Sequence, residues 1–463
     1  MADRYDVIVL GAGPGGYVAA IRAAQLGQKV AIIEKEFIGG VCLNIGCIPT
    51  KSLLKNAEVA HTLQHRGKEF GFSLKDLELD YGVAFSRSRQ VSERLVKGVG
   101  FLMRKHKIDV YEGTGRLTGA NSLVVSLNES GEKDLEADHI IIATGARPRT
   151  LPGVEFDGQR IISYIEGITS DSVPESIVII GGGAIGVEFA YIWANYGVDV
   201  TILEMMPHLL PNEDPEVSKV LEKAYKKLGV NFQTGARVET VEKDDKGVKV
   251  SLQDGSTLQA DQVMLAINFQ PNVENIGLED AGVALTDRGN IDIDGQMRTN
   301  VPNIYAIGDV ATDYRLAHIA SAMGIIAAET IAGHETVTLD FKMMPRCTYS
   351  VPQVASFGYT EEQAKEAGYE VNVGQFPFIA NGKALGLGER EGFVKIVADA
   401  KYGEILGAHM VGPDVTELLP ELTLAHNAEL TAEEIARNVH AHPTLSEVLM
   451  EAAHGVEGEP IHI

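Results

Sequence analysis

The sequence is poor in cysteine, with only three in 463 residues. So few cysteines exclude a secreted scaffold held by disulfides and fit a reducing cytosol. No run of about 18 apolar residues occurs, which argues against a membrane span. The start, MADRYDVIVLGAG, has no basic stretch followed by a long apolar region, so we expect no secretory signal and a cytoplasmic protein.

Basic residues are also in short supply, at 40 Lys and Arg against 64 Asp and Glu, for a formal net charge of −24. Nucleic acids and anionic membranes bind surfaces with a positive footprint, so we expect neither as a partner. Apolar residues make up 45% and charged residues 22%, as in ordinary globular proteins. The length predicts about three domains.

The first residues follow the plan of a nucleotide-binding unit. Val7–Leu10 form a continuous apolar run, as expected of a buried parallel strand. Gly11, Gly13 and Gly16 then give G-x-G-x-x-G, followed by a helix pattern and a second strand ending at Glu34. Such glycines allow a tight turn, the approach of a pyrophosphate and close packing of helix and strand. The stretch predicts a dinucleotide site at a helix N-terminus.

The same plan recurs 170 positions later, with Gly181, Gly183, Gly186 and Glu204. In each copy the acidic residue lies 23 positions after the first glycine (34−11 and 204−181). One such motif is weak evidence, because glycines also punctuate ordinary loops. Two copies at a common offset predict two dinucleotide sites. They also predict that electrons pass between FAD and NAD within the chain.

The second acid bears on which nicotinamide cofactor binds. A carboxylate at the end of the second strand accepts hydrogen bonds from a ribose diol and repels a 2′-phosphate. Residues 205–208, which follow Glu204, include no Arg or Lys to hold that phosphate. The sequence therefore favours NAD over NADP.

Two of the three cysteines, Cys42 and Cys47, lie five positions apart directly after the first unit. In a regular helix such residues rise about 7.5 Å along the axis, whereas the Cα atoms of a disulfide lie within about 7 Å. The pair can close only if the segment is distorted, which Gly46 and Pro49 favour. We expect a redox-active disulfide. A zinc site would need a second close pair, which is absent, and two inert buried thiols remain an alternative.

Five stretches together resemble one known family, the pyridine nucleotide–disulfide oxidoreductases, and the resemblance runs along essentially the whole chain. They are GGVCLNIGCIPTK (39–51), IIIATGARP (140–148), TNVPNIYAIGDV (299–310), RLAH (315–318) and NVHAHPTLSE (438–447). The resemblance implies an α/β fold with two Rossmann-like FAD/NAD(P)-binding domains plus a C-terminal α+β dimerisation domain. The expected boundaries are 1–148 and 272–341 for a discontinuous FAD domain, 149–271 for the NAD domain and 342–463 for the dimerisation domain.

The resemblance also assigns roles to the reactive residues. Cys42 would exchange disulfide with the substrate, and Cys47 would face the flavin. His442, oriented by Glu447, would be the base and would reach the disulfide from the other subunit of a homodimer. Two alternatives stay open on the residues alone: Thr444–Glu447 also reads as a capping box that starts a helix, and His440 is a second imidazole nearby.

Cofactor contacts follow from the same resemblance. Lys51 would approach the flavin and pair with Glu188. The residues expected at FAD are Gly11, Gly13, Gly16, Glu34, Lys51, Gly115, Thr144, Gly145, Asp309, Arg315, Leu316, Ala317 and His318. Those expected at NAD are Gly181, Gly183, Gly186, Glu188, Glu204, Val238 and Asn268. No metal site is expected.

The activity implied is oxidation of protein-bound dihydrolipoyl groups through the disulfide and FAD, with reduction of NAD. The implied partners are the lipoyl domains and the subunit-binding domain of a 2-oxo acid dehydrogenase complex, or a glycine cleavage system. A glutathione reductase-like enzyme is an alternative that would need an NADP pocket. A non-catalytic flavoprotein scaffold is another, but it leaves Cys42, Cys47, His442 and Glu447 unexplained.

The chain departs from the family pattern at LAINFQPN, where Asn268 replaces a glycine expected near the nicotinamide. A side chain there is expected to crowd bound NAD or to alter the backbone.

Replacing Asn268 by glycine should therefore tighten NAD binding, because it removes the side chain from the nicotinamide site. Titration of the two proteins with NAD measures the difference. Identical binding curves for both would refute the crowding idea.

Overall fold

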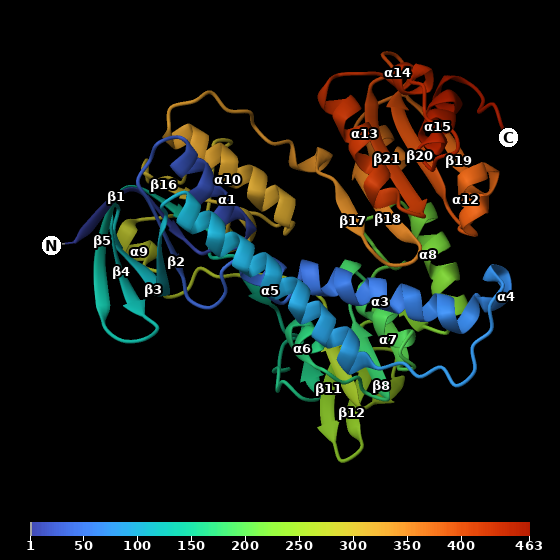
Figure 1. Ribbon diagram of the computed structural model, residues 1–463, viewed down its shortest axis with the longest axis horizontal. Coiled ribbons are helices and arrows are strands. Elements are labelled where there is room, and N and C mark those ends of the chain that lie inside the picture. The colour runs from blue at the N-terminus through green and yellow to red at the C-terminus, as the bar shows by residue number, and fades with distance from the viewer. Residues whose placement is uncertain (1) are drawn as a thin grey trace. The chain divides into compact units, whose positions relative to one another are not determined.

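The structure is a computed structural model that describes residues 2–463, and it divides into two compact units. The first unit is formed by Met1–Ser52, Val83–Arg149 and Asn268–Leu339. The second is formed by Leu53–Gly82, Thr150–Ile267 and Asp340–Ile463. The chain therefore leaves the first unit and returns to it twice, and each unit is described here by itself (Figure 1).

The first unit is built on one mixed sheet whose central strands are apolar on both faces. The strands are β1 (Asp3–Leu10), β2 (Val30–Glu34), β3 (Asp109–Gly119), β4 (Ser122–Leu127), β5 (Glu132–Ile142) and β16 (Ile304–Ala306). Pairing is parallel in the order β3–β2–β1–β5–β16. The far ends of β3 and β5 pair antiparallel with β4. Buried strands of this kind carry the carboxyl ends at which nucleotides bind.

Helices cover this sheet, and a short ribbon marks where the chain crosses between units. The helices are α1 (Pro14–Gln25), α2 (Gly40–Asn44), α3 (Cys47–His65), α5 (Tyr81–Lys105), α9 (Leu278–Ala281), η1 (Gly308–Val310) and α10 (Ala317–Ile331). Helices α3 and α5 each continue into the second unit. Figure 1 shows α1 and α10 side by side, and the two helices are in contact. Strands β6 (Ala146–Pro148) and β15 (Phe269–Pro271) pair antiparallel beside the crossings.

The second unit contains a parallel sheet that repeats the plan of the first. Its order is β10 (Asn231–Thr234), β9 (Asp199–Glu204), β8 (Ser176–Ile180), β14 (Gln262–Leu265) and β7 (Ile161–Ile162). Its helices are α4 (Gly67–Phe70), α6 (Tyr164–Thr169), α7 (Ala184–Ala194) and α8 (Pro215–Leu228). Between β10 and β14 lies an antiparallel sheet of β11 (Val238–Asp244), β12 (Gly247–Leu252) and β13 (Thr257–Ala260). The prediction of two strand–glycine turn–helix–strand units is confirmed.

The C-terminal part of the second unit is an antiparallel sheet flanked by helices, as the sequence predicts. The strand order is β17 (Arg346–Thr348), β18 (Gln353–Gly358), β21 (Ile405–Gly412), β20 (Phe393–Asp399) and β19 (Val371–Pro377). Its helices are η2 (Phe341–Met343), η3 (Phe378–Ala380), α11 (Glu361–Glu366), α12 (Gly382–Leu387), α13 (Val415–Asn427), α14 (Ala432–Arg437) and α15 (Glu447–Glu457). Strands β20 and β21 are buried along their whole length and form the core together with α13 and α15.

A buried lysine fixes the start of α8 to this C-terminal sheet. Lys395 of β20 is only 3% exposed, and its ammonium group lies 3.0 Å from Asp214 and 2.9 Å from Glu216. Asp214 is buried as well, and it caps α8 by accepting the backbone N–H of Glu216. The ion pair thus holds the segment that follows Glu204, a predicted NAD residue.

Replacing Lys395 by alanine should lower the free energy of unfolding by about 3–5 kcal/mol, because the buried carboxylate of Asp214 loses its counter-charge. Urea denaturation followed by circular dichroism measures the change. Lys365→Ala is the matched control, because its pair with Glu361 is exposed and should contribute less than about 1 kcal/mol. Equal losses of unfolding free energy in the two variants would show that the buried ion pair stabilises the protein no more than the exposed pair does.

Candidate active site

The dithiol segment lies at a break between two helices. Cys42 belongs to α2, and Cys47 is the first residue of α3. Helix α2 ends at Ile45, where φ is −138°, and Gly46 separates the two helices. The distortion that the spacing requires is therefore present. A hydrogen bond joins the side chains of the two cysteines.

This hydrogen bond determines how the pair ionises. It raises the pKa of Cys42 strongly, and burial adds to the effect, while the Lys51 ammonium opposes it. Two thiols this close share their first ionisation, because the remaining S–H stabilises the neighbouring thiolate. Cys42 therefore holds its proton more tightly than an isolated thiol does.

Residues that the sequence analysis missed hold the end of α2. The amide of Asn44 donates hydrogen bonds to the carbonyl oxygens of Ile38 and Gly40, at 3.0 and 2.9 Å. Arg89 of α5 donates to the carbonyl oxygen of Asn44 at 2.6 Å. Arg89 lies 45 positions from Asn44 inside an ordinary helical pattern, so no signal in the sequence marks it.

The first glycine turn admits only glycine at two of its three positions. Gly11 has a φ of +106°, and a Cβ there would lie 2.3 Å from the carbonyl oxygen of Ala143. A Cβ on Gly16 would lie 1.9 Å from the carbonyl oxygen of Gly11. A Cβ on Gly13 would meet nothing within 4 Å, and no side chain caps the first N–H groups of α1. The turn thus offers an open, electropositive helix end to a phosphate.

The second turn repeats this geometry. Gly181 has a φ of +114°, and its Cβ would lie 2.4 Å from the carbonyl oxygen of Ala266. A Cβ on Gly186 would lie 2.0 Å from the carbonyl oxygen of Gly181, while Gly183 faces open space. Helix α7 also begins without a side-chain cap. The second unit therefore fits a dinucleotide as well as the first does.

Each predicted ribose-binding carboxylate is bonded to its own glycine turn. Glu34 accepts the N–H of Ala12 at 2.7 Å, and Glu204 accepts the N–H of Gly182 at the same distance. The second oxygen of Glu204 accepts the N–H of Met206 at 2.8 Å. Both side chains are thus fixed at the carboxyl ends of β2 and β9.

Asp309 is the strongest observation in favour of a cofactor in the first unit. Its carboxylate accepts no hydrogen bond from residues 2–463, although the residue is only partly exposed. Burial raises its pKa to about 6, and the charge of Arg315 limits the rise. A largely buried carboxyl group that has no hydrogen-bond partner in the protein is suited to accept hydrogen bonds from the hydroxyl groups of a ribityl chain.

Other residues expected at FAD lie near the carboxyl ends of β5 and β16. Thr144 and Asn272 exchange hydrogen bonds of 2.8 and 2.9 Å, and Gly145 follows with a φ of +70°. Arg315, with Leu316, Ala317 and His318, forms the entry to α10. Gly115 lies on β3, where a Cβ would meet the side chain of Leu10 at 2.5 Å. Asn272 was not predicted, because its partner lies 128 positions away.

Asn268, the departure from the family pattern, has a hydrogen-bonding role. Its side-chain oxygen accepts the N–H of Phe269 and a guanidinium N–H of Arg315, both at 2.8 Å. Its φ is not in the left-handed region, so the asparagine does not distort the backbone. The expected crowding of NAD remains a prediction.

In the second unit, Glu188 is buried in α7 and accepts the N–H of Tyr349 at 2.9 Å. Val238 begins β11, where it pairs with Leu252. Lys51 belongs to the first unit, so its predicted pair with Glu188 remains a prediction.

The predicted base and its orienter are in contact. His442 Nδ1 lies 2.8 Å from Glu447 Oε1, and the backbone N–H of Thr444 donates to Glu447 Oε2 at 2.8 Å. One carboxylate therefore serves both the histidine and the turn that starts α15. Burial alone would raise the pKa of Glu447, but the Thr444 N–H and His442 outweigh burial and lower it.

The other imidazole, His440, differs in both exposure and bonding. The side chain of His442 is 79% exposed, whereas that of His440 is 3% exposed. Both ring nitrogens of His440 have partners, Asn438 O at 2.9 Å and Glu421 Oε1 at 3.0 Å. Of the two, His442 is the imidazole with a nitrogen, Nε2, available to a substrate.

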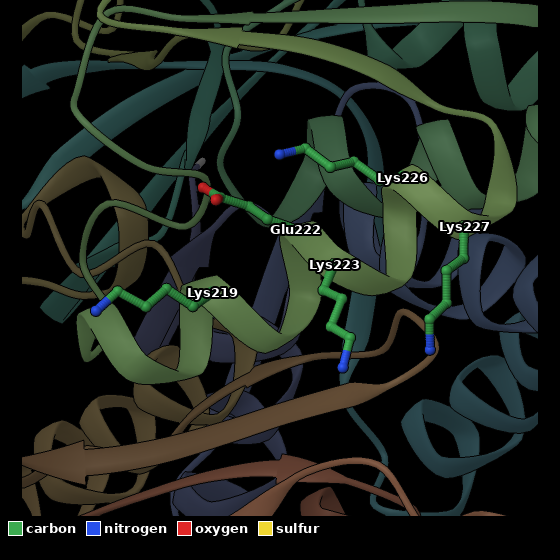
Figure 2. Close-up of a pocket in the computed structure, with 5 residues that line it drawn as sticks. All are labelled: Lys219, Glu222, Lys223, Lys226 and Lys227. Atoms are coloured by element: carbon green, nitrogen blue, oxygen red, sulfur yellow. The ribbon is translucent and has the colours of Figure 1, made fainter.

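A hollow of about 410 Å³ lies on α8 (Figure 2). It is lined by Lys219, Glu222, Lys223, Lys226 and Lys227. Glu222 accepts the N–H of Leu209, and Lys227 pairs with Glu391. Lysines in the last turn of a helix also offset its dipole. The hollow is a solvated helix face that contains no predicted site residue.

Among residues 2–463, no group of three or more His, Cys, Asp or Glu side chains could hold a metal ion. Within the same range, no helix is both long and apolar enough to cross a membrane.

Comparison with known proteins links both parts of the chain to one family. Residues 5–324 match the pyridine nucleotide-disulphide oxidoreductase family, and residues 344–453 match its dimerisation domain. The dihydrolipoyl dehydrogenase of Corynebacterium glutamicum is 56% identical over 470 residues, with 100% of each chain covered. That of Mycobacterium tuberculosis is 55% identical with 99% of each covered, and that of Bacillus subtilis is 44% identical with 100% of each covered.

Solved structures agree with this grouping. The crystal structure of LpdA from M. tuberculosis superposes with a TM-score of 0.91 at 27% identity, covering 98% of this chain and 99% of that one. The HOCl-induced flavoprotein disulfide reductase RclA from Escherichia coli gives 0.86 at 28% identity, covering 97% and 99%. The expected fold class, two nucleotide-binding domains and a C-terminal α+β dimerisation domain, is thereby confirmed. The chain belongs to the pyridine nucleotide-disulphide oxidoreductases.

Proposed function

We propose that this protein is an FAD-containing dihydrolipoyl dehydrogenase, which oxidises dihydrolipoyl groups to lipoyl groups and reduces NAD. The observation that carries the proposal is the hydrogen-bonded pair of Cys42 and Cys47, held at a helix break directly after a dinucleotide-binding turn. Full-length relatives with this activity at 44–56% identity support it. Glu204 and the absence of Arg or Lys at 205–208 favour NAD and count against a glutathione reductase-like enzyme.

The proposed reaction starts from the disulfide form of the cysteine pair. A substrate thiolate attacks the Cys42 sulfur, and Cys47 leaves as a thiolate that Lys51 stabilises. The second substrate thiolate then attacks the mixed disulfide at the substrate sulfur, so that the lipoyl ring closes and Cys42 leaves with a proton. FAD held at the first glycine turn would supply the acceptor for the electron pair of the dithiol and the donor of a hydride to NAD.

The base proposed for both thiol deprotonations is His442 of the partner subunit in a homodimer. A substrate thiol has a pKa of about 8.5, so at neutral pH it needs an acceptor for its proton. An imidazole with an ordinary pKa of about 6.5 is suited to this task. Glu447 fixes the ring through Nδ1, which leaves Nε2 to accept the proton.

Residues for both cofactors are proposed from the geometry. The N-terminus of α1 with Gly11, Gly13 and Gly16 would hold the FAD pyrophosphate, and Asp309 would bind its ribityl chain. The corresponding glycines at α7, with Glu204, would hold NAD. The remaining contacts at Glu34, Lys51, Gly115, Thr144, Gly145 and 315–318 for FAD, and at Glu188, Val238 and Asn268 for NAD, are proposed on the family resemblance.

The proposed partners are the lipoyl domains and subunit-binding domain of a 2-oxo acid dehydrogenase complex, or a glycine cleavage system. Low cysteine use supports a place in the reducing cytoplasm.

Anaerobic addition of dihydrolipoamide to the flavin-loaded protein tests the function. A long-wavelength absorption band should appear as the Cys47 thiolate interacts with the flavin, and NADH should form when NAD is added. Cys47→Ser should lose the band and at least about 1000-fold in turnover. Cys347→Ser is the matched control and should keep both, because Cys347 lies on β17, away from the pair in sequence and element. Formation of NADPH instead of NADH, or unchanged turnover in Cys47→Ser, would contradict the proposal.

FAD binding should weaken as the pH falls below 6, because the raised pKa of Asp309, about 6, means that its carboxylate takes up a proton there. A hydroxyl group donates to the ionised carboxylate, so affinity should fall by up to about tenfold per pH unit below that pKa. Flavin fluorescence at pH 5–8 measures the dissociation constant, and Asp309→Asn should remove this dependence.

Asp313→Asn serves as the control, since a hydrogen bond from Arg288 lowers the pKa of Asp313 and keeps it ionised throughout this range. An identical pH dependence of FAD binding in Asp309→Asn and in the unmodified protein would show that Asp309 does not bind FAD.

A further inference from the structure

The segment that carries His442 is anchored by a carboxylate on another helix. Glu421 lies in α13, and its Oε1 accepts hydrogen bonds from the Asn438 amide at 3.2 Å and from His440 Nε2 at 3.0 Å. Both residues belong to the loop between α14 and α15. One carboxylate oxygen thus binds two side chains of the segment that leads to His442.

His440 is the buried point of this loop. Within 438–443 every residue except His440 is exposed, and the side chain of Val439 is among the most exposed in the chain at 93%. Within the single chain, the loop is therefore held mainly by polar contacts, and those of His440 and Asn438 join it to α13.

Both ring nitrogens of His440 face acceptors. Its Nδ1 lies 2.9 Å from the carbonyl oxygen of Asn438 and its Nε2 lies 3.0 Å from the carboxylate of Glu421. A hydrogen bond to an ionised carboxylate is stronger than one between neutral groups, so the bond to Glu421 is the main constraint on the ring.

His440 also lies close enough to affect the orienting carboxylate. His440 is one of the groups that lower the pKa of Glu447, after the Thr444 N–H and His442. The charged groups around His440 are therefore Glu421 on α13 and Glu447 at the start of α15. His440 lies between the anchor and the pair of His442 and Glu447.

We propose that Glu421 and His440 form a positioning pair, which fixes the loop so that His442 and Glu447 keep the orientation needed to deprotonate a dithiol. The inference rests on the function proposed above. Neither residue touches the reacting sulfurs, and both act through His442. Disturbing the pair should slow dithiol oxidation and leave the exchange between NADH and flavin intact.

Glu421→Gln tests this role, because it keeps the shape of the side chain and removes the carboxylate charge that strengthens its bonds to His440 and Asn438. The catalytic efficiency with free dihydrolipoamide, kcat/KM, should fall about 10- to 100-fold, part of the 10²–10⁴ that a general base supplies. The loss should appear in kcat, with the KM for NAD unchanged. Oxidation of NADH by ferricyanide, which runs through the flavin without the dithiol, should be unchanged.

Glu417→Gln is the matched control, since Glu417 is an exposed carboxylate one turn earlier on the same helix. It should stay within about twofold of the unmodified protein, as expected for a surface substitution. Should Glu421→Gln fold poorly, His440→Gln replaces the rigid imidazole by a flexible amide, and it should show the same selective loss.

A double-mutant cycle separates positioning from general structural damage. In a His442→Gln background, Glu421→Gln should cause no further loss of dithiol oxidation, because the group through which it acts is already gone. Equal effects of Glu421→Gln and Glu417→Gln, or losses that multiply in the double variant, would overturn the proposal. Absence of dihydrolipoamide oxidation by the unmodified protein would instead refute the proposed function itself.

Discussion

The hydrogen bond between the thiols of Cys42 and Cys47 is the interaction on which the proposed chemistry depends. A continuous helix would hold residues five apart too far from each other, so the break after α2 is what brings them together. Asn44 stabilises that break from within the motif, and Arg89 does so from α5. The reactive pair is therefore a product of local backbone geometry and of support from a distant helix.

The two glycine turns show how much a short motif can specify. Gly11 and Gly16, like Gly181 and Gly186, lie where any Cβ would meet a backbone carbonyl oxygen, so the residue type follows from sterics alone. Because the three glycines and the acidic residue of such a motif lie within about 25 positions, the sequence predicted both units and both acidic residues. The distortion between the cysteines was predicted on the same local grounds.

Contacts between distant positions could not be predicted in this way. Arg89, Asn272 and Glu421 meet partners 45, 128 and 19 positions away, and nothing in their own neighbourhoods marks them. Asn268 was expected only to crowd a cofactor, yet its side chain binds Arg315, 47 positions on. The sequence left open whether Glu447 caps the start of a helix or orients His442. In the structure one carboxylate oxygen binds His442 and the other accepts the N–H of Thr444, so the residue does both.

The attachment of Glu204 to its glycine turn has a consequence for altering coenzyme preference. Its two oxygens accept the N–H groups of Gly182 and Met206, and the side chain is buried. Exchanging this side chain for a short neutral one would leave both amides without an acceptor. Re-engineering toward the phosphorylated dinucleotide therefore demands a rebuilt loop after β9 as well as a new cation.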